Sequence, residues 1–257
     1  MVCCNLCESI TNKSPMLTIT IGKARSHRGK SSRPINRTSL TLALASLALL
    51  WSLPTRAADP ATVSFSLDFP GSDPDHYSIS VQSDAHAKYE CSARISQDSE
   101  DRETYQTELS LSDATRARIF ELAAQAHYFS GKIDSGNHKL ANTGAKKLTY
   151  KDGQKETTAA YNFSPQPAIQ QLTALFQNIS ATLEFGRRLA HLHRYQKLAL
   201  DDELKRMENQ MRTGDLIELQ AVKPILQDIY DDSSVMNVVR ARAQRIMGMA
   251  NGSAARR

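Results

Sequence analysis

The chain has 257 residues, 40% of them hydrophobic and 23% charged, which is enough to bury the core of one or two globular domains. Its net charge of +5 belongs to residues 1–57, which hold eight of the 32 basic residues and one of the 27 acidic ones, so the rest of the chain carries −2. The positive net charge is therefore no sign of nucleic-acid binding, because affinity for phosphates needs a basic face on the folded protein.

An uncharged apolar run extends from Thr38 to Leu53, preceded by Arg33 and Arg37. Its 16 residues fall short of the about 20 that a membrane-spanning helix needs. Small residues follow the run, as they do at the cleavage site of an export signal. We therefore expect cleavage after Ala57, or after the neighbouring Ala58, and a periplasmic or secreted protein with no stable membrane anchor. An uncleaved anchor is the alternative.

Three of the four cysteines, Cys3, Cys4 and Cys7, precede the basic region of this leader. They indicate either a metal or redox tail or a start codon placed too far upstream. We favour the second, because a single C-x-x-C pair lacks a second pair of ligands. After cleavage Cys91 is the one cysteine left. It is either a reactive thiol or a small buried residue, and the strand pattern around it favours burial.

The first part of the mature chain alternates apolar and polar residues, which predicts strands. The expected strands are 61–68, 77–81, 87–91, 105–109, 145–150 and 155–162. Asp152-Gly153 between the last two is a strong hairpin signal.

The period changes at Ser112, which is expected to cap a helix over 113–127. Pro165 and Pro167 open a second helix with apolar residues on one face from 169 to 183. From 184 onward the pattern predicts helices alone. Gly214 is expected to end one of them, with Asp215 capping the next and Ser233 the last.

These elements predict an α+β fold: a small antiparallel sheet with helices on one face, followed by an all-helical C-terminal segment. The expected organisation is a leader over 1–57, an α+β domain over 58–183, a helical segment over 184–248 and a disordered tail over 249–257.

The order of motifs resembles a family of exported bacterial α+β domains of unknown function. In that family a Gly-x-Cys-Pro loop precedes a tyrosine-containing strand, an Asp-Gly turn, a second strand and an α-β-β-α part. Here Gly71-Ser-Asp-Pro74 stands at the loop, Tyr77-Ser-Ile-Ser-Val81 at the strand, and Asp84 to Tyr89 at the turn and second strand. The resemblance covers about residues 61–183. It implies an α+β fold outside the cytoplasm and brings no activity, and this chain has no cysteine in that loop.

Asp73, Asp75 and His76 lie together in one loop and are the candidate binding residues. Alternate carboxylates can ligate Ca²⁺, but the loop lacks the glycine and the glutamate that a calcium loop carries at its sixth and twelfth positions. A solvated Asp-Pro turn is the favoured interpretation, so no metal or cofactor is expected.

Lys139, Lys146, Lys147, Lys151 and Lys155 surround the predicted hairpin. They could form a basic patch that binds an acidic polysaccharide, lipid or protein. We prefer the other interpretation, in which these charges prevent the edge strand from pairing with another chain and aggregating.

The sequence holds no nucleophile elbow, His-Glu-x-x-His, Walker loop or dinucleotide fingerprint. The preferred hypothesis is a non-catalytic structural or partner-binding protein of the cell envelope. Its C-terminal helices would bind a protein partner or mediate self-association. The alternative is a periplasmic hydrolase of unrecognised type, built around histidine, aspartate and serine residues near 131–144.

Overall fold

The computed structural model describes residues 59–94, 101–137 and 139–254, with side chains described to residue 250. These residues belong to one compact unit, Ala57–Arg257. Among them no helix is long and apolar enough to cross a membrane. The leader, its cysteines and the apolar run at 38–53 lie outside the described residues.

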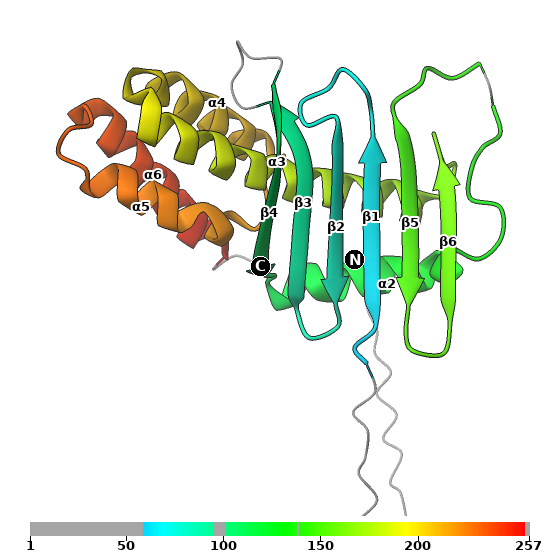
Figure 1. Ribbon diagram of the computed structural model, residues 1–257. Coiled ribbons are helices and arrows are strands. Elements are labelled where there is room, and N and C mark those ends of the chain that lie inside the picture. The colour runs from blue at the N-terminus through cyan, green and yellow to red at the C-terminus, as the bar shows by residue number, and fades with distance from the viewer. Residues whose placement is uncertain (1–58, 95–100, 138, 255–257) are drawn as a thin grey trace, which may run out of the picture. The chain divides into compact units, whose positions relative to one another are not determined.

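In the described part of the chain, six strands form one sheet in the order β4-β3-β2-β1-β5-β6, and each neighbouring pair is antiparallel (Figure 1). The strands are β1 (Thr62–Asp68), β2 (His76–Gln82), β3 (His86–Arg94), β4 (Arg102–Ser110), β5 (Ala145–Lys151) and β6 (Glu156–Tyr161). The β5–β6 turn contains Asp152 and Gly153, and Gly153 has the positive φ of +70° that such a turn requires. This confirms the predicted hairpin.

The alternation of the sequence sets which face of the sheet is buried. In β1, Val63 and Phe65 are fully buried, whereas Ser64 and Ser66 lie on the opposite, more accessible face. Phe65 of β1 pairs with Ile79 of β2, so the apolar side chains of neighbouring strands share one face. An antiparallel sheet can expose its other face to water, and this one does.

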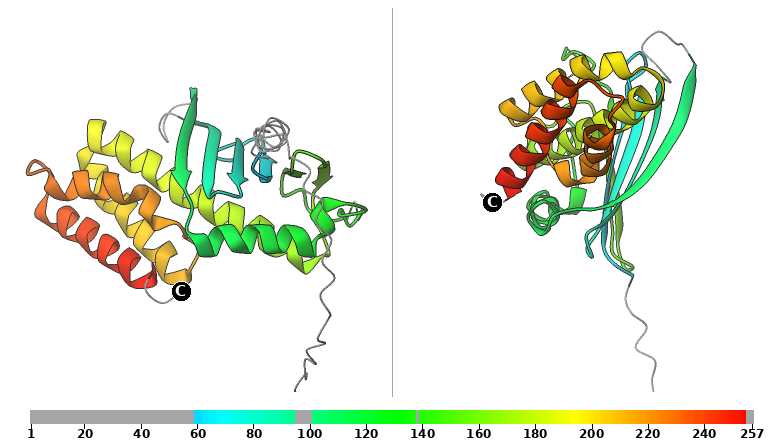
Figure 2. Two further views of the ribbon diagram at one scale, coloured as in Figure 1. Left: turned by 90° about the horizontal axis from the view of Figure 1, so that it is seen from below. Right: turned by 90° about the vertical axis from the view of Figure 1, so that its left-hand side faces the viewer.

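Two helices, α2 (Asp113–Gln125) and α3 (Pro167–Tyr195), cover the apolar face, as the right-hand view of Figure 2 shows. Phe65 stacks on Phe176 of α3 with ring centroids 5.4 Å apart. The first hydrophobic core therefore lies between the sheet and these helices. The predicted fold class is confirmed.

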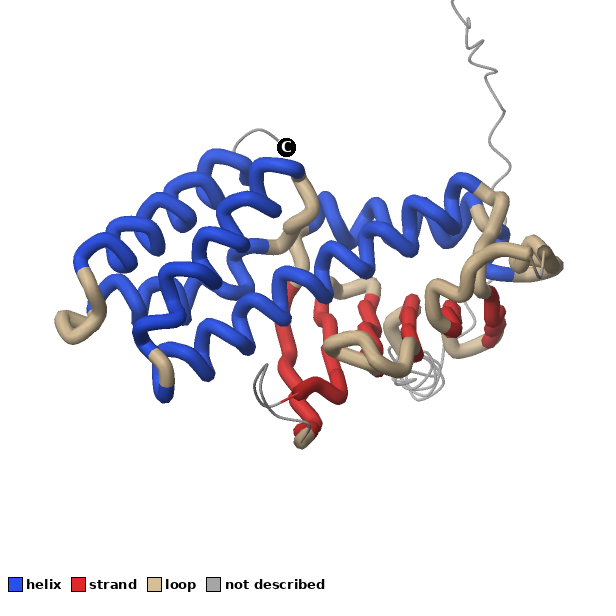
Figure 3. Tube along the Cα trace, turned by 90° about the horizontal axis from the view of Figure 1, so that it is seen from above, coloured by secondary structure: helices blue, strands red, loops and turns tan. Residues whose placement is uncertain are grey.

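A second core lies beyond the sheet, among the C-terminal third of α3 and the helices α4 (Leu200–Thr213), α5 (Lys223–Asp231) and α6 (Asn237–Ala254) (Figure 3). Leu200, Leu204 and Met207 of α4 point into it, as their helical spacing predicts. Gly214 ends α4 with a φ of +83°, again as predicted.

The boundary expected between 183 and 184 lies inside α3, which is continuous from Pro167 to Tyr195. What changes near this point is the hydrophobic core against which the helix packs: Leu183 lies in the first core and Phe185 in the second. Gly186 lies at this transition, and a Cβ there would be 2.7 Å from Cγ1 of Val222. Glycine thus lets the 3₁₀ helix η3 (Leu219–Val222) approach α3 closely.

Three boundaries predicted for the helical segment are wrong. Asp215 does not cap a helix, because residues 215–218 are extended or irregular before η3, and Pro224 lies in the first turn of α5. Ser233 is in a turn, and α6 begins at Asn237. The chain is helical to Ala254 where a tail was expected from 249, because Met247 and Ala250 pack on the second core.

Candidate functional site

The loop residues singled out from the sequence have separate partners in the structure. Asp73 accepts a hydrogen bond from the backbone N–H of Arg94 at 3.1 Å, and Asp75 forms an ion pair with Arg102 at 2.7 Å. His76 contacts Asp68 through Nδ1 at 2.5 Å. Within the described ranges no three His, Cys, Asp or Glu side chains are grouped as metal ligands would be. The two loop carboxylates thus tie the loop to β3 and β4, and His76, the first residue of β2, contacts β1.

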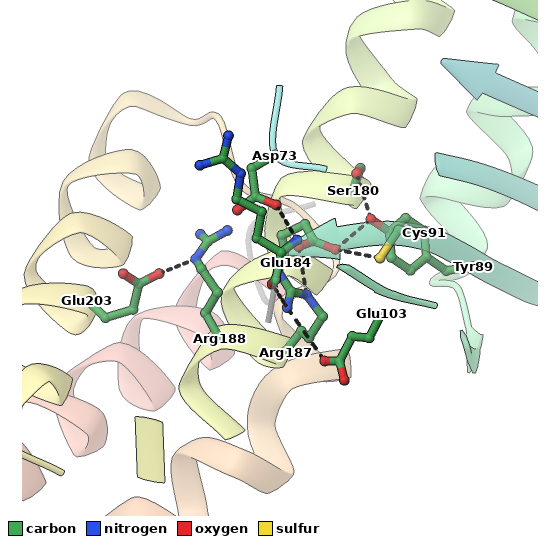
Figure 4. Close-up of polar contacts among 10 residues, drawn as sticks. Asp73, Tyr89, Cys91, Glu103, Ser180, Glu184, Arg187, Arg188 and Glu203 are labelled. Carbon is green, nitrogen blue, oxygen red and sulfur yellow. Dashed lines mark hydrogen bonds and ion pairs between the residues drawn. The ribbon is translucent and has the colours of Figure 1, made fainter. Parts of the chain in front are cut away.

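A buried polar cluster lies where α3 crosses β3, and we call it the Glu184 cluster: Tyr89, Cys91, Ser180, Glu184 and Arg187 (Figure 4). Tyr89 donates a hydrogen bond to Oε1 of Glu184 at 2.8 Å, and the Cys91 thiol donates to the same oxygen at 3.2 Å. Arg187 Nε donates to Oε2 of Glu184 at 2.9 Å. The side chains of Glu184 and Arg187 are only 3% and 5% exposed. One carboxylate thus satisfies two strand residues and one arginine.

The Glu184 cluster reaches the predicted loop through Arg187 and Arg94. Arg187 Nη1 donates to the backbone carbonyl of Arg94 at 3.0 Å, and Asp73 accepts from the amide of the same residue. Arg187 also lies 4.0 Å from Glu103 of β4 (Figure 4). Asp73 therefore belongs to a network that joins α3 to the sheet. Sequence reasoning missed Glu184 and Arg187, because a charged i, i+3 pair on a helix usually faces water.

The electrostatics of the Glu184 cluster keep its thiol protonated. Burial, together with the neighbouring Glu184 carboxylate, raises the pKa of Cys91 to about 12. Burial also raises the pKa of Tyr89. Burial opposes the charge of Arg187, but Glu184 outweighs it and the pKa of Arg187 is raised. A nucleophilic cysteine needs a lowered pKa and access to solvent, and Cys91 has neither. The predicted burial of Cys91 is confirmed, with a carboxylate as its partner.

The basic hairpin is divided between the two faces of the sheet. Lys147 and Lys151 are exposed, whereas Lys146 is buried on the same face as Leu148 and Tyr150. The alternation of β5 already contained this information, since Lys146, Leu148 and Tyr150 are two residues apart. The five lysines are therefore not one surface patch.

A different surface gathers apolar side chains at the far end of the helical segment. The turn between α3 and α4 exposes Tyr195 (63%) and Leu198 (82%), and the start of α6 exposes Met236 and Val238. Lys197 joins the two turns, with Nζ 2.6 Å from Oδ2 of Asp232. Figures 1 and 3 show both turns at the end of the segment away from the sheet. We call these four apolar side chains the tip surface.

Comparison of the chain with known proteins found no matching family model and no matching curated protein.

Proposed function

We propose that this chain is an exported, non-catalytic protein of the cell envelope that acts through protein–protein contact, and that it self-associates through the tip surface. The observation that carries the proposal is the concentration of Tyr195, Leu198, Met236 and Val238 on two adjoining turns. Large apolar side chains grouped on a protein surface are typical of interaction sites.

Two properties of the tip surface support a second copy of the chain as its partner: its apolar character and the charges beside it. An apolar surface is complementary to itself, as the two-fold contact of a homodimer requires. The α3–α4 turn adds the exposed Arg194, and the end of α5 adds the exposed Asp228 and Asp231. A two-fold contact brings the basic turn of one copy to the acidic turn of the other. Burying one leucine side chain contributes about 1.5–3 kcal/mol to such a contact.

Export is supported by the sequence of the leader, with its basic region, its short apolar run and small residues at 55–57. The resemblance of residues 61–183 to an exported family supports the same location.

The hydrolase alternative needs a histidine hydrogen-bonded to both a carboxylate and a nucleophile. His193 Nε2 lies 2.9 Å from Oδ2 of Asp232, but the nearby Ser234 donates its hydrogen bond to Oδ1 of Asp232 rather than to the imidazole. The aspartate is therefore the central group and the imidazole is not placed to take the serine proton. No observation among the described residues favours hydrolysis over binding.

Sedimentation equilibrium of the protein purified from the periplasmic fraction tests self-association. We expect a dimer, and Leu198→Glu is expected to weaken dimerisation by at least about tenfold, because it places a charge in the apolar contact. Leu140→Glu is the matched control, since Leu140 is an exposed leucine in the loop before β5 and lies outside the helical segment. A wild-type monomer at all concentrations, or equal effects of both variants, would contradict the proposal.

Intact mass of the protein from fractionated cells that express the full reading frame tests export. A periplasmic species lighter by about 6 kDa is expected for cleavage after Ala57. A full-length species retained in the membrane fraction would contradict cleavage.

A further inference from the structure

A cleft with both polar and apolar lining opens at one end of β5 and β6, on the side of the molecule opposite to the tip surface along α3. Its cavity measures about 330 Å³ and is lined by Lys146 and Asn162 of the sheet end, Phe163 of the loop, and Gln170 and Gln177 of α3. A second hollow, lined by Asp68 and Gly144 among others, adjoins it through Lys146, Tyr161 and Asn162. We call the first cavity the Lys146 cleft.

Lys146 is the unusual member of this lining, because neutral oxygens surround its buried ammonium. The residue is 6% exposed. Its Nζ contacts four neutral oxygens: the carbonyl of Thr143 at 3.0 Å, the hydroxyl of Thr143 at 2.8 Å, the carbonyl of Asn162 at 3.0 Å and the carbonyl of Gly144 at 3.3 Å. No ion pair of Lys146 occurs in the part of the chain that the structure describes. Neutral oxygens orient the ammonium but leave its charge uncompensated, and such a charge is costly to bury.

Desolvation also lowers the pKa of Lys146, because burial disfavours its charged form. An anion held at the cleft would offset the charge and recover part of that free energy. Lysine binds phosphates as well as carboxylates, but a carboxylate carries the one negative charge that this single ammonium offsets in full, whereas a phosphate dianion would bring a second.

The remaining lining of the Lys146 cleft suits hydroxyl groups. Gln170 and Gln177 are seven residues apart on α3, so they lie along one side of the helix. Nε2 of Gln170 donates one hydrogen bond to the carbonyl of Ser164 at 2.9 Å, which leaves its second N–H and its amide oxygen for a ligand. Thr173 lies between the two glutamines, and its hydroxyl already bonds Tyr161. Amide groups both donate and accept, as the hydroxyls of a ligand do. The ring of Phe163 is 43% exposed at the edge of the cleft and offers a flat apolar face.

We propose that the Lys146 cleft binds an acidic sugar, a polyhydroxylated ring that carries one carboxylate. The carboxylate takes the place of one neutral oxygen beside Nζ of Lys146, the amides of Gln170 and Gln177 bond the hydroxyls, and Phe163 packs against the C–H face of the ring. The sugar is either a free molecule or the end of an acidic polysaccharide. This site is independent of the tip surface.

Isothermal titration calorimetry with glucuronate as the probe, and glucose and acetate as comparisons, tests the site on the protein purified from cells. We expect glucuronate to bind at least about tenfold more tightly than either comparison, because glucose lacks the charge and acetate lacks the ring. A short oligomer of galacturonate distinguishes the two sources: binding of the monomer supports a free sugar, and binding of the oligomer alone supports a polysaccharide end. No binding of monomer or oligomer, or equal binding of glucose and glucuronate, overturns the proposal.

Three variants assign the binding to the cleft. Lys146→Met retains the length of the side chain and is expected to reduce glucuronate affinity by at least about tenfold. Lys147→Met is the matched control, because Lys147 is the next residue of β5 but lies on the opposite, exposed face of the sheet. Phe163→Ala changes an exposed residue of the loop and is expected to weaken binding without unfolding the protein. Equal affinities of the Lys146→Met and Lys147→Met proteins, or unchanged binding by Phe163→Ala, overturn the assignment.

Discussion

At the scale of single residues, the buried pair Glu184–Arg187 joins α3 to the sheet through hydrogen bonds from both side chains. Both charges are desolvated, and each has hydrogen bonds beyond the ion pair: Tyr89 and Cys91 on the carboxylate, and the carbonyl of Arg94 on the guanidinium. A buried pair of this kind depends on both members, since loss of one leaves the other without compensation.

Glu184→Ala is therefore expected to reduce the free energy of unfolding by about 3–5 kcal/mol. The matched control is Glu121→Ala, because Glu121 pairs with Arg118 at the same i, i+3 spacing, 2.8 Å apart, but on the exposed side of α2. The control is expected to lose no more than about 1 kcal/mol. Urea denaturation followed by circular dichroism measures both. Equal losses would contradict the role of burial.

The thiol of Cys91 makes stability depend on alkaline pH. Its pKa of about 12 in the folded protein is above the ordinary value of 9.0, so the unfolded chain loses the proton first as pH rises. The contribution of Cys91 to stability is thus complete below pH 9 and is lost progressively toward pH 12.

Cys91→Ser isolates this contribution, because serine keeps a donor for Glu184 but does not titrate in this range. The difference in unfolding free energy between wild type and Cys91→Ser is expected to move against the wild type by up to about 1.4 kcal/mol per pH unit above pH 9. Urea denaturation at pH 8, 9 and 10 measures it. A difference that stays constant would show that the thiol titrates normally.

At the scale of elements, the start of α2 is stabilised by a residue from the far end of the chain. Glu218 accepts hydrogen bonds from the backbone N–H of Ser112 at 2.9 Å and from its hydroxyl at 2.7 Å, and it also bonds the hydroxyl of Thr115. Ser112 in turn accepts from the amide of Thr115, which confirms it as the N-cap. A buried carboxylate at a helix N-terminus is favoured by the helix dipole.

Glu218→Gln keeps the shape of this side chain but removes its charge and half of its accepting capacity. We expect a loss of about 1–3 kcal/mol in the free energy of unfolding, since donors at the start of α2 become unsatisfied. Glu108→Gln in β4 is the control, because its carboxylate is largely exposed, and no measurable loss is expected. Chemical denaturation of the two variants decides the matter. Equal stabilities would contradict a capping role for Glu218.

At the scale of the whole folded unit, α3 belongs to both hydrophobic cores. Its first half packs on the sheet and its last third packs on α4, α5 and α6. The C-terminal segment also returns to the first core: Ile217 is buried there, and its carbonyl accepts from the hydroxyl of Thr182 at 2.7 Å. The two cores are thus linked by a continuous helix and by contacts from residues 217 and 218.

A chain that ends at Leu183 is accordingly expected not to fold cooperatively, although the sequence suggests a domain boundary there. It lacks Glu184, Arg187 and Glu218, which contact the sheet or α2, and Ile217, which is buried in the first core. A chain that ends at Ala250 retains every described side chain and serves as the control. Thermal unfolding followed by near-ultraviolet circular dichroism separates the outcomes. A sharp transition in the shorter chain would contradict the coupling of the two cores.

The local signals of the sequence were reliable where contacts are local. Four such signals occur in the structure: the alternation in β1 to β3, the Asp152-Gly153 turn, Ser112 as the N-cap of α2 and Gly214 at the end of α4. Each specifies a conformation through neighbours a few residues away. The predictions failed at Asp215 and Ser233. These polar residues resemble helix caps, but the helices that follow begin later, where Pro224 and the packing of α6 place them.

By itself, then, the sequence determined the α+β class, the inward faces of β1 to β3, the hairpin and the helical nature of the C-terminal segment. Only the tertiary structure decided that Glu184 meets Tyr89 from 95 residues away, that Glu218 caps a helix 106 residues earlier, and that the ammonium of Lys146 meets neutral oxygens of residues 143 and 162. The physical reason is that a charged residue reads as solvent-exposed in any local pattern. Its burial becomes favourable only when distant parts of the chain supply the hydrogen-bond partners that replace water.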